Sequence, residues 1–460
     1  MVHFKITDKM CQELKSHLHN GDGLEALAFI ICGRLNHEGD NWLLAHEIFL
    51  MPYEKCSRDV NYVSWKTKHI EHLLDKAKDK GFAIVKIHSH FMLDSDFSEL
   101  DDISDKSFFE SVYGWSNSDL PHASIIMYPD GSMKGRTIEN DMSFSAIPKI
   151  TVVGNDIKNF QFFERASVGK EFIRTQQAFG EKTTKLLRGL KIAVIGCSGT
   201  GSPVIEQLVR LGVGTLVLAD GDFIEYKNLN RIIGSTFADA KANTLKVLAL
   251  KNHIEKIGLG TKVITFPSLI QENRKAIDTL ASCDMIFGCV DSFEGRFYLN
   301  LISTYYLVPL IDIGVKLVAD GNGGVDSING NIHYVNPGSE TLLERGVFTQ
   351  EQLTAESLRR ISPHEYEKRK TYFDNLDIES PAVISVNMTF ASFAVNEMLA
   401  RFHPFRYSDN IKFSHTCINL SDWDINRSEV KETESKSALR HIGIGNIEPE
   451  LEIYDSETVI

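Results

Sequence analysis

The sequence predicts an α/β protein whose second half is built on a doubly wound, mostly parallel sheet. Three observations support this fold class: a strand-type apolar run that leads directly into a glycine turn, regular alternation of strand and helix signals after it, and a length of 460 residues. That length allows about two to four domains. We therefore expect a separate first domain, followed by a domain of parallel strands joined by crossover helices.

The glycine turn follows Lys191–Ile195 (KIAVI), a short buried strand by composition. Its glycines are Gly196, Gly199 and Gly201. Glycines let a backbone approach a phosphate closely, and Pro203 suits the first turn of a helix, where an N–H is not needed. A second strand, Thr215–Ala219, ends at Asp220, where a carboxylate would bind a ribose. The pattern predicts a nucleotide site at the carboxyl edge of the sheet.

Polar residues suited to MgATP follow this turn in order: Asp222, Asn230, Arg231, Lys246 and Asp291. A triphosphate with magnesium needs cations and polar groups for its oxygens and a carboxylate for the metal. Taken singly, each residue is equally well explained as a surface charge or a helix cap. Their order after a strand, a glycine turn and a helix favours the functional interpretation.

Five sequence blocks between about Arg174 and Phe405 resemble the adenylating domain shared by ThiF, MoeB and the ubiquitin-activating enzymes. The blocks are IRTQQAFG, IGCSGTGSP, DGDFIEYKNLNR, ADAKANTLK and CVDSFEGRFYLN. The resemblance implies a Rossmann-like domain that binds ATP and Mg²⁺ and works as a homodimer. One departure is Ser198, where the family usually has glycine; because serine is small, we expect an altered loop rather than lost binding.

The same resemblance implies a role for each site residue. Asp220 would hold the ribose, Asn230 and Arg231 the phosphates, Lys246 the phosphates during attack, Asp291 the magnesium, and Arg174 the ATP of the dimer partner.

Two features common in the adenylating family are missing. Relatives often carry Cys-x-x-Cys after a Pro-Gly, but Thr341 and Glu344 stand at these places, so we expect no structural zinc in this half. The crossover segment, about Arg369 to Pro381, contains no cysteine, which argues against a thioester intermediate. Cys417 is the only cysteine after Asp291, and we interpret it as a strand residue.

Helix and strand signals of the first half predict its elements in order. They are a helix capped by Thr7 with Met10, Leu14 and Leu18 on one face, strands Glu25–Gly33 and Trp42–Met51, a helix Trp65–Lys78 stopped by Gly81, a strand Phe82–Ile87, and a hairpin His122–Thr137 that turns at Pro129-Asp-Gly131.

His88 and His90 follow the strand that ends at Ile87. Two residues apart in an extended segment, they lie on one face, about 6 to 7 Å apart along the chain. Histidines at a strand end are usually structural, and Ser98-x-x-Asp101 is also an acceptable helix start. The whole spacing, His-x-His-x(7)-Ser-x(2)-Asp, is nevertheless similar to the signature of the JAMM (JAB/MPN) metalloproteases.

This second resemblance implies Zn²⁺ held by His88, His90 and Asp101, with a fourth position open for water. It implies that Glu25 acts as the general base and that Ser98 steadies the oxyanion. Glu38 and Glu47 lie nearby in the sequence, and only the strand context selects Glu25.

Composition limits the classes of partner. A formal net charge of −13 argues against a nucleic-acid binder or an anionic-membrane binder, because both need a basic face. Seven scattered cysteines fit a reducing cytoplasm, and no run approaches the roughly twenty apolar residues of a membrane span. We therefore expect a cytoplasmic protein.

We divide the chain into a JAMM-like metalloprotease domain (1–150), a linker (151–168), a ThiF/MoeB-like adenylation domain (169–424), and a polar linker with an acidic tail (425–460). The leading hypothesis is a bifunctional enzyme that adenylates the C-terminal carboxylate of a ubiquitin-like protein and cleaves a peptide or isopeptide bond after that terminus. Its expected partners are the ubiquitin-like tail, a conjugating enzyme and a second copy of the chain. Resemblance to fusions in bacterial conjugation-like operons adds phage defence as a context.

Two alternatives remain open. A peptide-modifying adenylyltransferase of the microcin-tailoring type is favoured by the missing crossover cysteine and disfavoured by the fused first half. A scaffold that binds a ubiquitin-like tail without catalysis is disfavoured by the complete set of metal and ATP residues.

Overall fold

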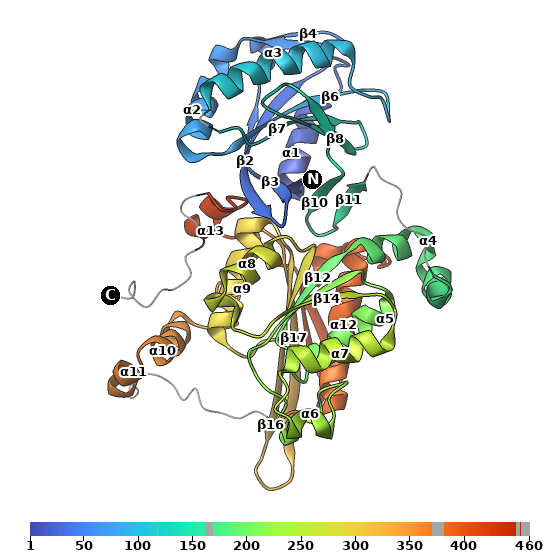
Figure 1. Ribbon diagram of the computed structural model, residues 1–460, viewed down its shortest axis with the longest axis vertical. Helices are drawn as coiled ribbons and strands as arrows, with labels where there is room; N and C mark the ends of the chain where they lie inside the picture. Colours follow the sequence, from blue (N-terminus) through green and yellow to red (C-terminus); the bar gives the residue numbers. More distant parts are fainter. Residues whose placement is uncertain (117, 162–168, 370–380, 448–450, 452–460) are drawn as a thin grey trace. The chain divides into compact units, whose positions relative to one another are not determined.

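A computed structural model describes residues 1–116, 118–161, 169–369, 381–447 and 451 (Figure 1). The chain divides into two compact units. The first comprises Met1–Glu164, Thr304–Leu307 and Ser437–Glu452, and the second comprises Arg165–Ser303, Val308–Lys436 and Ile453–Ile460. In the described residues, no helix combines the length and the hydropathy needed to cross a bilayer.

In the described part of the first unit, nine strands form one mixed sheet in the order β11-β10-β1-β3-β2-β6-β7-β8-β9. The strands are β1 (Val2–Thr7), β2 (Leu27–His37), β3 (Asp40–Leu50), β6 (Ala83–Ser89), β7 (His122–Met127), β8 (Met133–Ile138), β9 (Phe144–Ala146), β10 (Lys149–Val153) and β11 (Lys158–Gln161). A separate hairpin pairs β4 (Cys56–Arg58) with β5 (Val63–Trp65). The central pair, β2 and β6, is antiparallel.

The helices of this unit are α1 (Asp8–Leu18), α2 (Glu71–Lys80) and α3 (Glu99–Trp115). Thr7 caps α1 as predicted, because Met10 N donates to its Oγ1 at 3.3 Å. Gly81 ends α2 with φ +75°, also as predicted. The helix begins later than the expected Trp65, because Trp65 pairs in the β4–β5 hairpin.

The segment 151–168, expected to be a linker, instead contributes strands to the first sheet. β10 pairs in parallel with β1, and β11 pairs antiparallel with β10. Ile150 and Val152 are buried in the core of this unit. The apolar run KITVV follows polar and mixed residues and, unlike KIAVI, does not lead into a glycine turn and a helix, so the sequence alone placed the boundary too early.

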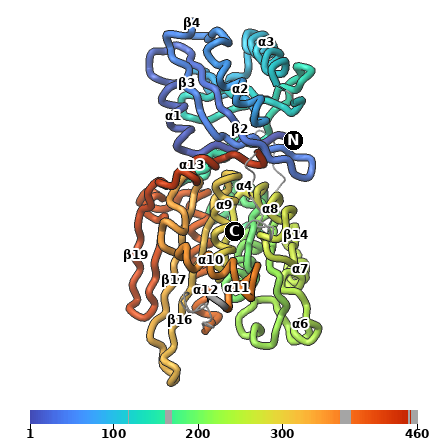
Figure 2. Tube along the Cα trace, turned by 90° about the vertical axis from the view of Figure 1, so that its left-hand side faces the viewer, coloured from blue at the N-terminus to red at the C-terminus, as the bar shows by residue number. Residues whose placement is uncertain are grey.

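The segment 425–460, expected to be a linker and tail, is divided between the units. β19 (Asp424–Ser428) is an exposed edge strand of the second sheet. The chain after α13 (Lys436–His441) lies against β2 and β3 of the first unit (Figure 2). There, Asn446 N donates to Arg34 O at 2.8 Å.

Glycine makes this close packing possible. Gly443 has φ +66°, and a Cβ built on it would lie 2.3 Å from Ala45 O on β3. Any side chain would therefore separate the two backbones. The sequence shows the glycines, but only the fold shows what lies against them.

In the described part of the second unit, eight strands form one sheet in the order β14-β13-β12-β15-β16-β17-β18-β19. The strands not yet given are β12 (Lys191–Ile195), β13 (Thr215–Ala219), β14 (Lys262–Phe266), β15 (Met285–Gly288), β16 (Leu310–Ala319), β17 (Val325–Val335) and β18 (His415–Asn419). In this order, each strand from β14 to β16 is parallel to its neighbour, and the pairs β16–β17, β17–β18 and β18–β19 are antiparallel. This confirms an α/β fold with a parallel-rich sheet.

The chain winds from β12 outward through β13 and β14, and then returns to β15 on the other side of β12. The carboxyl ends of β12 and β15 therefore flank the topological switch point, where ligands bind in open parallel sheets. The helices of this unit are α4 (Ile173–Gly189), α5 (Gly201–Leu211), α6 (Phe237–Lys241), α7 (Lys246–Ile257), α8 (Arg274–Ala281), α9 (Phe293–Tyr306), α10 (Gln350–Ile361), α11 (Pro363–Arg369) and α12 (Ile384–Phe402).

α12 packs against α5 and against β16 and β17 (Figure 1). The sequence Asn329-Gly-Asn331 is typical of a turn, but it lies inside β17. A Cβ on Gly330 would lie 2.2 Å from the ring of Phe390 on α12. This glycine therefore serves close helix–sheet packing rather than chain reversal.

Candidate functional site

Two histidines and one carboxylate of the first unit converge on a single point. His88 lies near the end of β6, His90 lies just beyond it, and Asp101 lies in the first turn of α3. His88 Nε2 is 3.1 Å from His90 Nε2 and 3.0 Å from Asp101 Oδ1, and His90 Nε2 is 3.4 Å from Asp101 Oδ2. The three ligand atoms lie within 4.8 Å of one another. Two imidazoles and a carboxylate fit zinc with a fourth position left open.

Asp101 takes part in both a helix cap and this cluster. Ser98 N and Oγ donate to Asp101 Oδ2 at 2.8 and 2.7 Å, which completes a capping box, while Oδ1 faces His88. The two interpretations of Ser-x-x-Asp are therefore compatible. Burial raises the pKa of Asp101, but the neighbouring imidazoles of His88 and His90 outweigh this effect and hold the pKa well below its usual range. The role of Ser98 toward an oxyanion stays a prediction.

Glu25 lies on the same face of the sheet as the histidines. β2 pairs antiparallel with β6 with Leu27 opposite His88, and Glu25 lies two residues before Leu27 as His90 lies two residues after His88; both His90 and Asp101 act on Glu25 through their charges. Glu25 is 6% exposed, and burial raises its pKa to about 7, against the opposing effect of His90. A carboxyl group of this pKa can gain and lose a proton near neutral pH.

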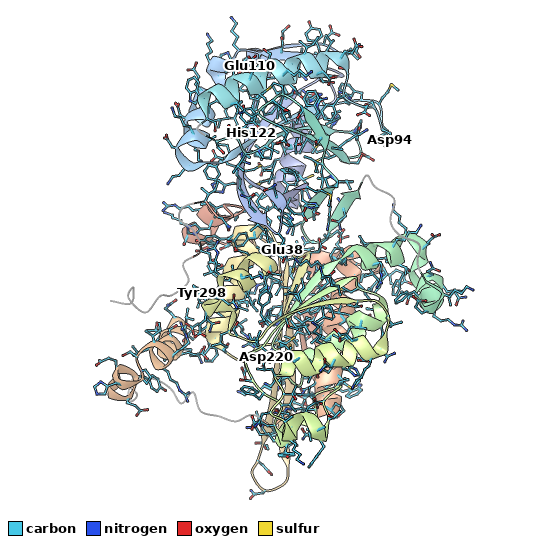
Figure 3. All side chains as sticks on the ribbon, in the orientation of Figure 1. Glu38, Asp94, Glu110, His122, Asp220 and Tyr298 are labelled. Atoms are coloured by element: carbon cyan, nitrogen blue, oxygen red, sulfur yellow. The ribbon has the colours of Figure 1, made fainter. Side chains whose placement is uncertain are left out.

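The other two carboxylates that competed with Glu25 in the sequence lie elsewhere. Glu38, labelled in Figure 3, follows the far end of the eleven-residue strand β2. Glu47 on β3 pairs with Lys76 of α2. Neither is in the register position that faces the histidines.

A buried charge cluster that the sequence did not reveal fastens α3 to β6. Lys86 pairs with Asp105, and Arg136 Nη2 lies 2.7 Å from the same carboxylate. Lys86 lies two residues before His88 on the strand, and Asp105 lies four residues after Asp101 on the helix. The Lys86–Asp105 ion pair therefore joins the same faces of β6 and α3 as the His88–Asp101 contact does. The signal in the sequence is this matched i,i+2 and i,i+4 spacing. The cluster positions the carboxylate opposite the imidazoles.

In the second unit, the glycine turn connects β12 to α5. Cys197 N donates to Asp220 Oδ2 at 2.7 Å, which joins the turn to the end of β13. Gly196 has φ +88°, and a Cβ on it would lie 2.4 Å from Cys289 O at the end of β15. A Cβ on Gly201 would lie 1.8 Å from Gly196 O. These contacts explain the glycines without reference to a ligand, and they bring three strand ends together.

Asp220, labelled in Figure 3, is coupled to Asp222 and Lys246. Lys246 Nζ lies 2.6 Å from Asp222 Oδ2 and 3.7 Å from Asp220 Oδ1, and Asp222 N donates to Asp220 Oδ1 at 2.9 Å. Burial raises the pKa of Asp220. Burial lowers the pKa of Lys246, but the two carboxylates outweigh it and the net shift is upward. The lysine is therefore a cation at neutral pH.

Arg231 lies over the glycine turn, since a Cβ on Gly199 would lie 3.1 Å from Arg231 Cδ. Arg231 Nη1 donates to Lys227 O at 2.7 Å and to Asn230 Oδ1 at 3.3 Å. The same Cβ would lie 2.4 Å from Asn387 Nδ2. Asn387 was missed by sequence reasoning; its signal is a buried amide in the apolar helix α12.

Asp291 is exposed two residues after Cys289 and lines a cavity of about 760 Å³. The structure brings it to the same edge of the sheet as Asp220, without a direct contact between them. Three other lining residues occupy consecutive strands, because Asp312 pairs with His333 and His333 pairs with His415. The two imidazole rings are stacked at 4.3 Å, and burial lowers the pKa of His333 to about 2. The sequence could not reveal this row, because it depends on strand register.

Arg174 is the predicted site residue that the structure does not bring to the others. It is exposed on α4, and its Nη1 donates to Gln177 on the same helix at 3.0 Å. Its proposed role, which acts across a dimer, stays a prediction.

Glu344, which stands in place of a cysteine expected from the resemblance, forms a hydrogen-bonded clamp. Its carboxylate accepts from Thr341 N at 2.7 Å, from Thr433 Oγ1 at 2.8 Å, and from the N–H groups of Glu434 and Ser435 at 3.2 Å. All seven cysteines are free, and Cys417 is partly buried in β18. Residues 370–380 of the crossover segment lie outside the described residues.

Comparison with known proteins assigns the second half of the chain to a family. The ThiF family matches residues 173–440. The chain is 30% identical over 162 residues to "Adenylyltransferase and sulfurtransferase UBA4" of Meyerozyma guilliermondii, covering 34% of this chain and 37% of that protein. It is 30% identical over 159 residues to "Ubiquitin-like modifier-activating enzyme 5" of Caenorhabditis elegans, covering 33% of this chain and 36% of that one. The chain thus spans little more than a third of the length of these relatives.

Among solved structures, E. coli MccB with MccA-N7isoASN matches with a TM-score of 0.46 and 17% identity, over 59% of this chain and 75% of that one.

Proposed function

The chain belongs to the ThiF family, and on that premise we propose that its second unit binds MgATP and adenylates the C-terminal carboxylate of a ubiquitin-like protein. The observation that carries the proposal is the joined network of Asp220, Asp222 and Lys246 at the switch point of the sheet. The names of the curated relatives, an adenylyltransferase and a ubiquitin-like modifier-activating enzyme, support the same reaction class.

In this proposal the residues of the chain act mainly through charge and position. Asp220 holds the ribose hydroxyls, while Arg231 and Asn230 bind phosphate oxygens above the glycine turn. Asp291 is the carboxylate that would hold magnesium, which offsets phosphate charge when bound. Lys246 is already paired with two carboxylates, so we expect it to exchange Asp222 for a phosphate oxygen as the nucleotide binds. The attacking carboxylate then meets less negative charge at the α-phosphate.

ATP–pyrophosphate exchange by the full chain with a candidate ubiquitin-like partner tests this proposal. We expect Asp291→Asn to abolish exchange and Asp326→Asn, an exposed carboxylate on β17, to leave it unchanged. Exchange that survives Asp291→Asn would refute the magnesium assignment. Activity recovered by mixing Arg174→Ala chains with Lys246→Ala chains would support a homodimer in which Arg174 acts on the partner's ATP.

We propose a second activity for the first unit: zinc-dependent hydrolysis of the peptide or isopeptide bond after the same C-terminus. The convergence of His88, His90 and Asp101 carries this proposal. When bound there, zinc would polarise the scissile carbonyl and acidify water. Glu25 on the same face accepts the proton of the attacking water and returns it to the leaving amine, a task that suits a pKa of about 7.

Zinc content and cleavage test the second activity. We expect about one zinc per chain in the wild type, none in His88→Ala, and an unchanged content in His364→Ala, whose side chain is 84% exposed. A ubiquitin-like protein with a C-terminal extension is the cleavage substrate, and Glu25→Gln should retain zinc while losing cleavage. Equal zinc in the wild type and His88→Ala would remove the protease proposal.

The competing functions have distinct outcomes in the same assays. Exchange that leads to a modified peptide but never to a conjugate would favour the peptide-tailoring enzyme. Tail binding without exchange or cleavage would favour the scaffold.

A further inference from the structure

Ser95 lies in the loop between β6 and α3, one residue after Asp94, which Figure 3 labels. Its hydroxyl oxygen is 2.9 Å from His90 Nδ1, the ring nitrogen that faces away from the metal-ligand cluster. The same hydroxyl donates to Met92 O at 2.8 Å. Ser95 therefore joins a main-chain carbonyl to a histidine of the proposed zinc site.

Neighbouring strands hold this loop in place. Tyr128, directly after β7, donates its hydroxyl to Ser95 O at 2.5 Å, and His90 N donates to Met127 O at 3.1 Å. The next residue, Asp96, pairs with Lys134 of β8 at 2.9 Å. The position of the Ser95 hydroxyl is thus set by the sheet and not by the loop alone.

A serine hydroxyl carries a single proton, and this fixes the direction of both hydrogen bonds. With that proton directed to Met92 O at 2.8 Å, the oxygen accepts from His90 and the imidazole proton lies on Nδ1. The lone pair of a neutral His90 is then on Nε2, the atom that lies 3.1 Å from His88 Nε2 and 3.4 Å from Asp101 Oδ2. The opposite tautomer would leave Met92 O without this donor.

We infer that Ser95 is a positioning residue that sets the tautomer and ring orientation of His90 for zinc. The inference rests on the proposed metallopeptidase function of the first unit. Nothing in the sequence motif identifies it, since Ser95 falls among the seven unspecified residues between His90 and Ser98.

His88 provides an internal contrast. Its Nδ1 is buried, and among the described residues it has no hydrogen-bond partner. Zinc on His88 Nε2 requires the proton on that Nδ1, where it would be buried without an acceptor, which disfavours the binding tautomer. The Nδ1 atom of His90 thus has a hydrogen-bond partner, whereas that of His88 has none in the part of the chain that the structure describes. The contribution of Ser95 should therefore be measurable in the zinc affinity of the site.

Zinc affinity of the full chain, measured by chelator competition at fixed pH, tests the inference with a matched pair of variants. Ser95→Ala removes the acceptor and should weaken zinc binding about ten- to hundredfold, the usual effect of losing a hydrogen-bond partner of a ligand histidine. Ser95→Thr keeps the hydroxyl and should bind within about threefold of the wild type. ¹⁵N NMR of the imidazole nitrogens of zinc-free protein provides a second readout. His90 should carry its proton on Nδ1 in the wild type and Ser95→Thr, and show a mixture of tautomers in Ser95→Ala.

The outcomes separate the inference from the function on which it rests. Wild-type zinc affinity and an unchanged His90 tautomer in Ser95→Ala would overturn the inference while the zinc site stands. A wild type that binds no zinc would overturn both. Tyr128→Phe is the control for any loss of thermal stability in zinc-free Ser95→Ala, because it frees the loop but keeps the Ser95 hydroxyl. We expect Tyr128→Phe to be equally destabilised but to bind zinc more tightly than Ser95→Ala. Weaker zinc binding by Tyr128→Phe than by Ser95→Ala would contradict the tautomer role.

Discussion

The two candidate sites differ in how far the protein assembles them without a ligand. In the first unit, three ligand atoms from one strand end and one helix start already lie within 4.8 Å of one another. In the second unit, Lys246 and Asp220 are joined, but Asp291 and Asn230 are exposed, and in the described residues no hydrogen bond or ion pair joins them to this pair. The difference teaches that metal-ligand residues within one stretch of fourteen residues, 88 to 101, are placed together by one strand end and one helix start. Residues that come from separate loops and from the start of α7 are not brought into contact by local structure alone.

The largest expected effect concerns the buried charge cluster behind the first site. Asp105→Ala removes the carboxylate shared by Lys86 and Arg136, and should destabilise the first unit by about 3–5 kcal/mol because a buried cation loses its partner. Hydrogen–deuterium exchange would show faster exchange in β6 and α3. Asp102→Ala, which removes a 45% exposed partner of Arg136, is the control and should cost under about 1 kcal/mol. An equal loss of stability in Asp105→Ala and Asp102→Ala would show that the burial of Asp105 does not make its ion pairs more important.

The second expected effect is on catalysis in the second unit. Lys246→Ala should lower the ATP–pyrophosphate exchange rate about 100- to 1000-fold, the usual cost of losing one group that stabilises a developing charge. Zinc content of the first unit should not change. Lys251→Ala, which removes a partly exposed lysine from the same helix, is the control. A comparable loss of the exchange rate in Lys251→Ala would point to a general effect of removing a positive charge. It would contradict a specific role for Lys246.

A third test asks whether the first unit depends on the C-terminal segment. Gly443→Ala should destabilise that unit by about 1–3 kcal/mol, because it combines positive φ with a Cβ 2.3 Å from Ala45 O. Gly39→Ala is a matched control with φ +85° and open space around its Cβ. The difference between the two melting temperatures measures the packing of the segment. No difference would mean that the segment is dispensable.

The smallest expected effect concerns the Glu344 clamp of the second unit. Glu344→Gln should cost about 1 kcal/mol near neutral pH, since three main-chain N–H groups and the Thr433 hydroxyl lose a charged acceptor. Burial raises the pKa of Glu344, but the hydrogen bonds outweigh it and the pKa in the folded protein is lowered. The stabilisation is therefore complete above the unfolded pKa of about 4.3 and is lost as the pH falls through the lower folded value.

Urea unfolding at several pH values would measure this effect. The gap between wild type and Glu344→Gln should close below about pH 4, whereas Glu429→Gln, at an exposed site, should match the wild type throughout. A gap that widens in acid would contradict the assignment.

Much of the second sheet could be predicted from the sequence. Lys191–Ile195 and Thr215–Ala219 are strands with the predicted bounds, because a buried parallel strand is a continuous apolar run between turn residues. Some strands of other kinds were not predicted from the sequence. β10 lies among polar and mixed residues and was assigned to a linker, and β19 is exposed at every position, so its sequence has no hydrophobic pattern that distinguishes it from a linker.

The sequence by itself determined the fold class, the glycine turn and the spacing of His88, His90 and Asp101, because strand and helix periods act over a few residues. Only the tertiary structure decided that Glu25 faces His90, that Asp105 anchors α3 to Lys86, and that Ser95 contacts His90. It also decided that Gly443 packs on β3 across nearly 400 residues of chain. The physical reason is that strand register and close backbone packing depend on which surfaces meet, and local sequence does not carry that information.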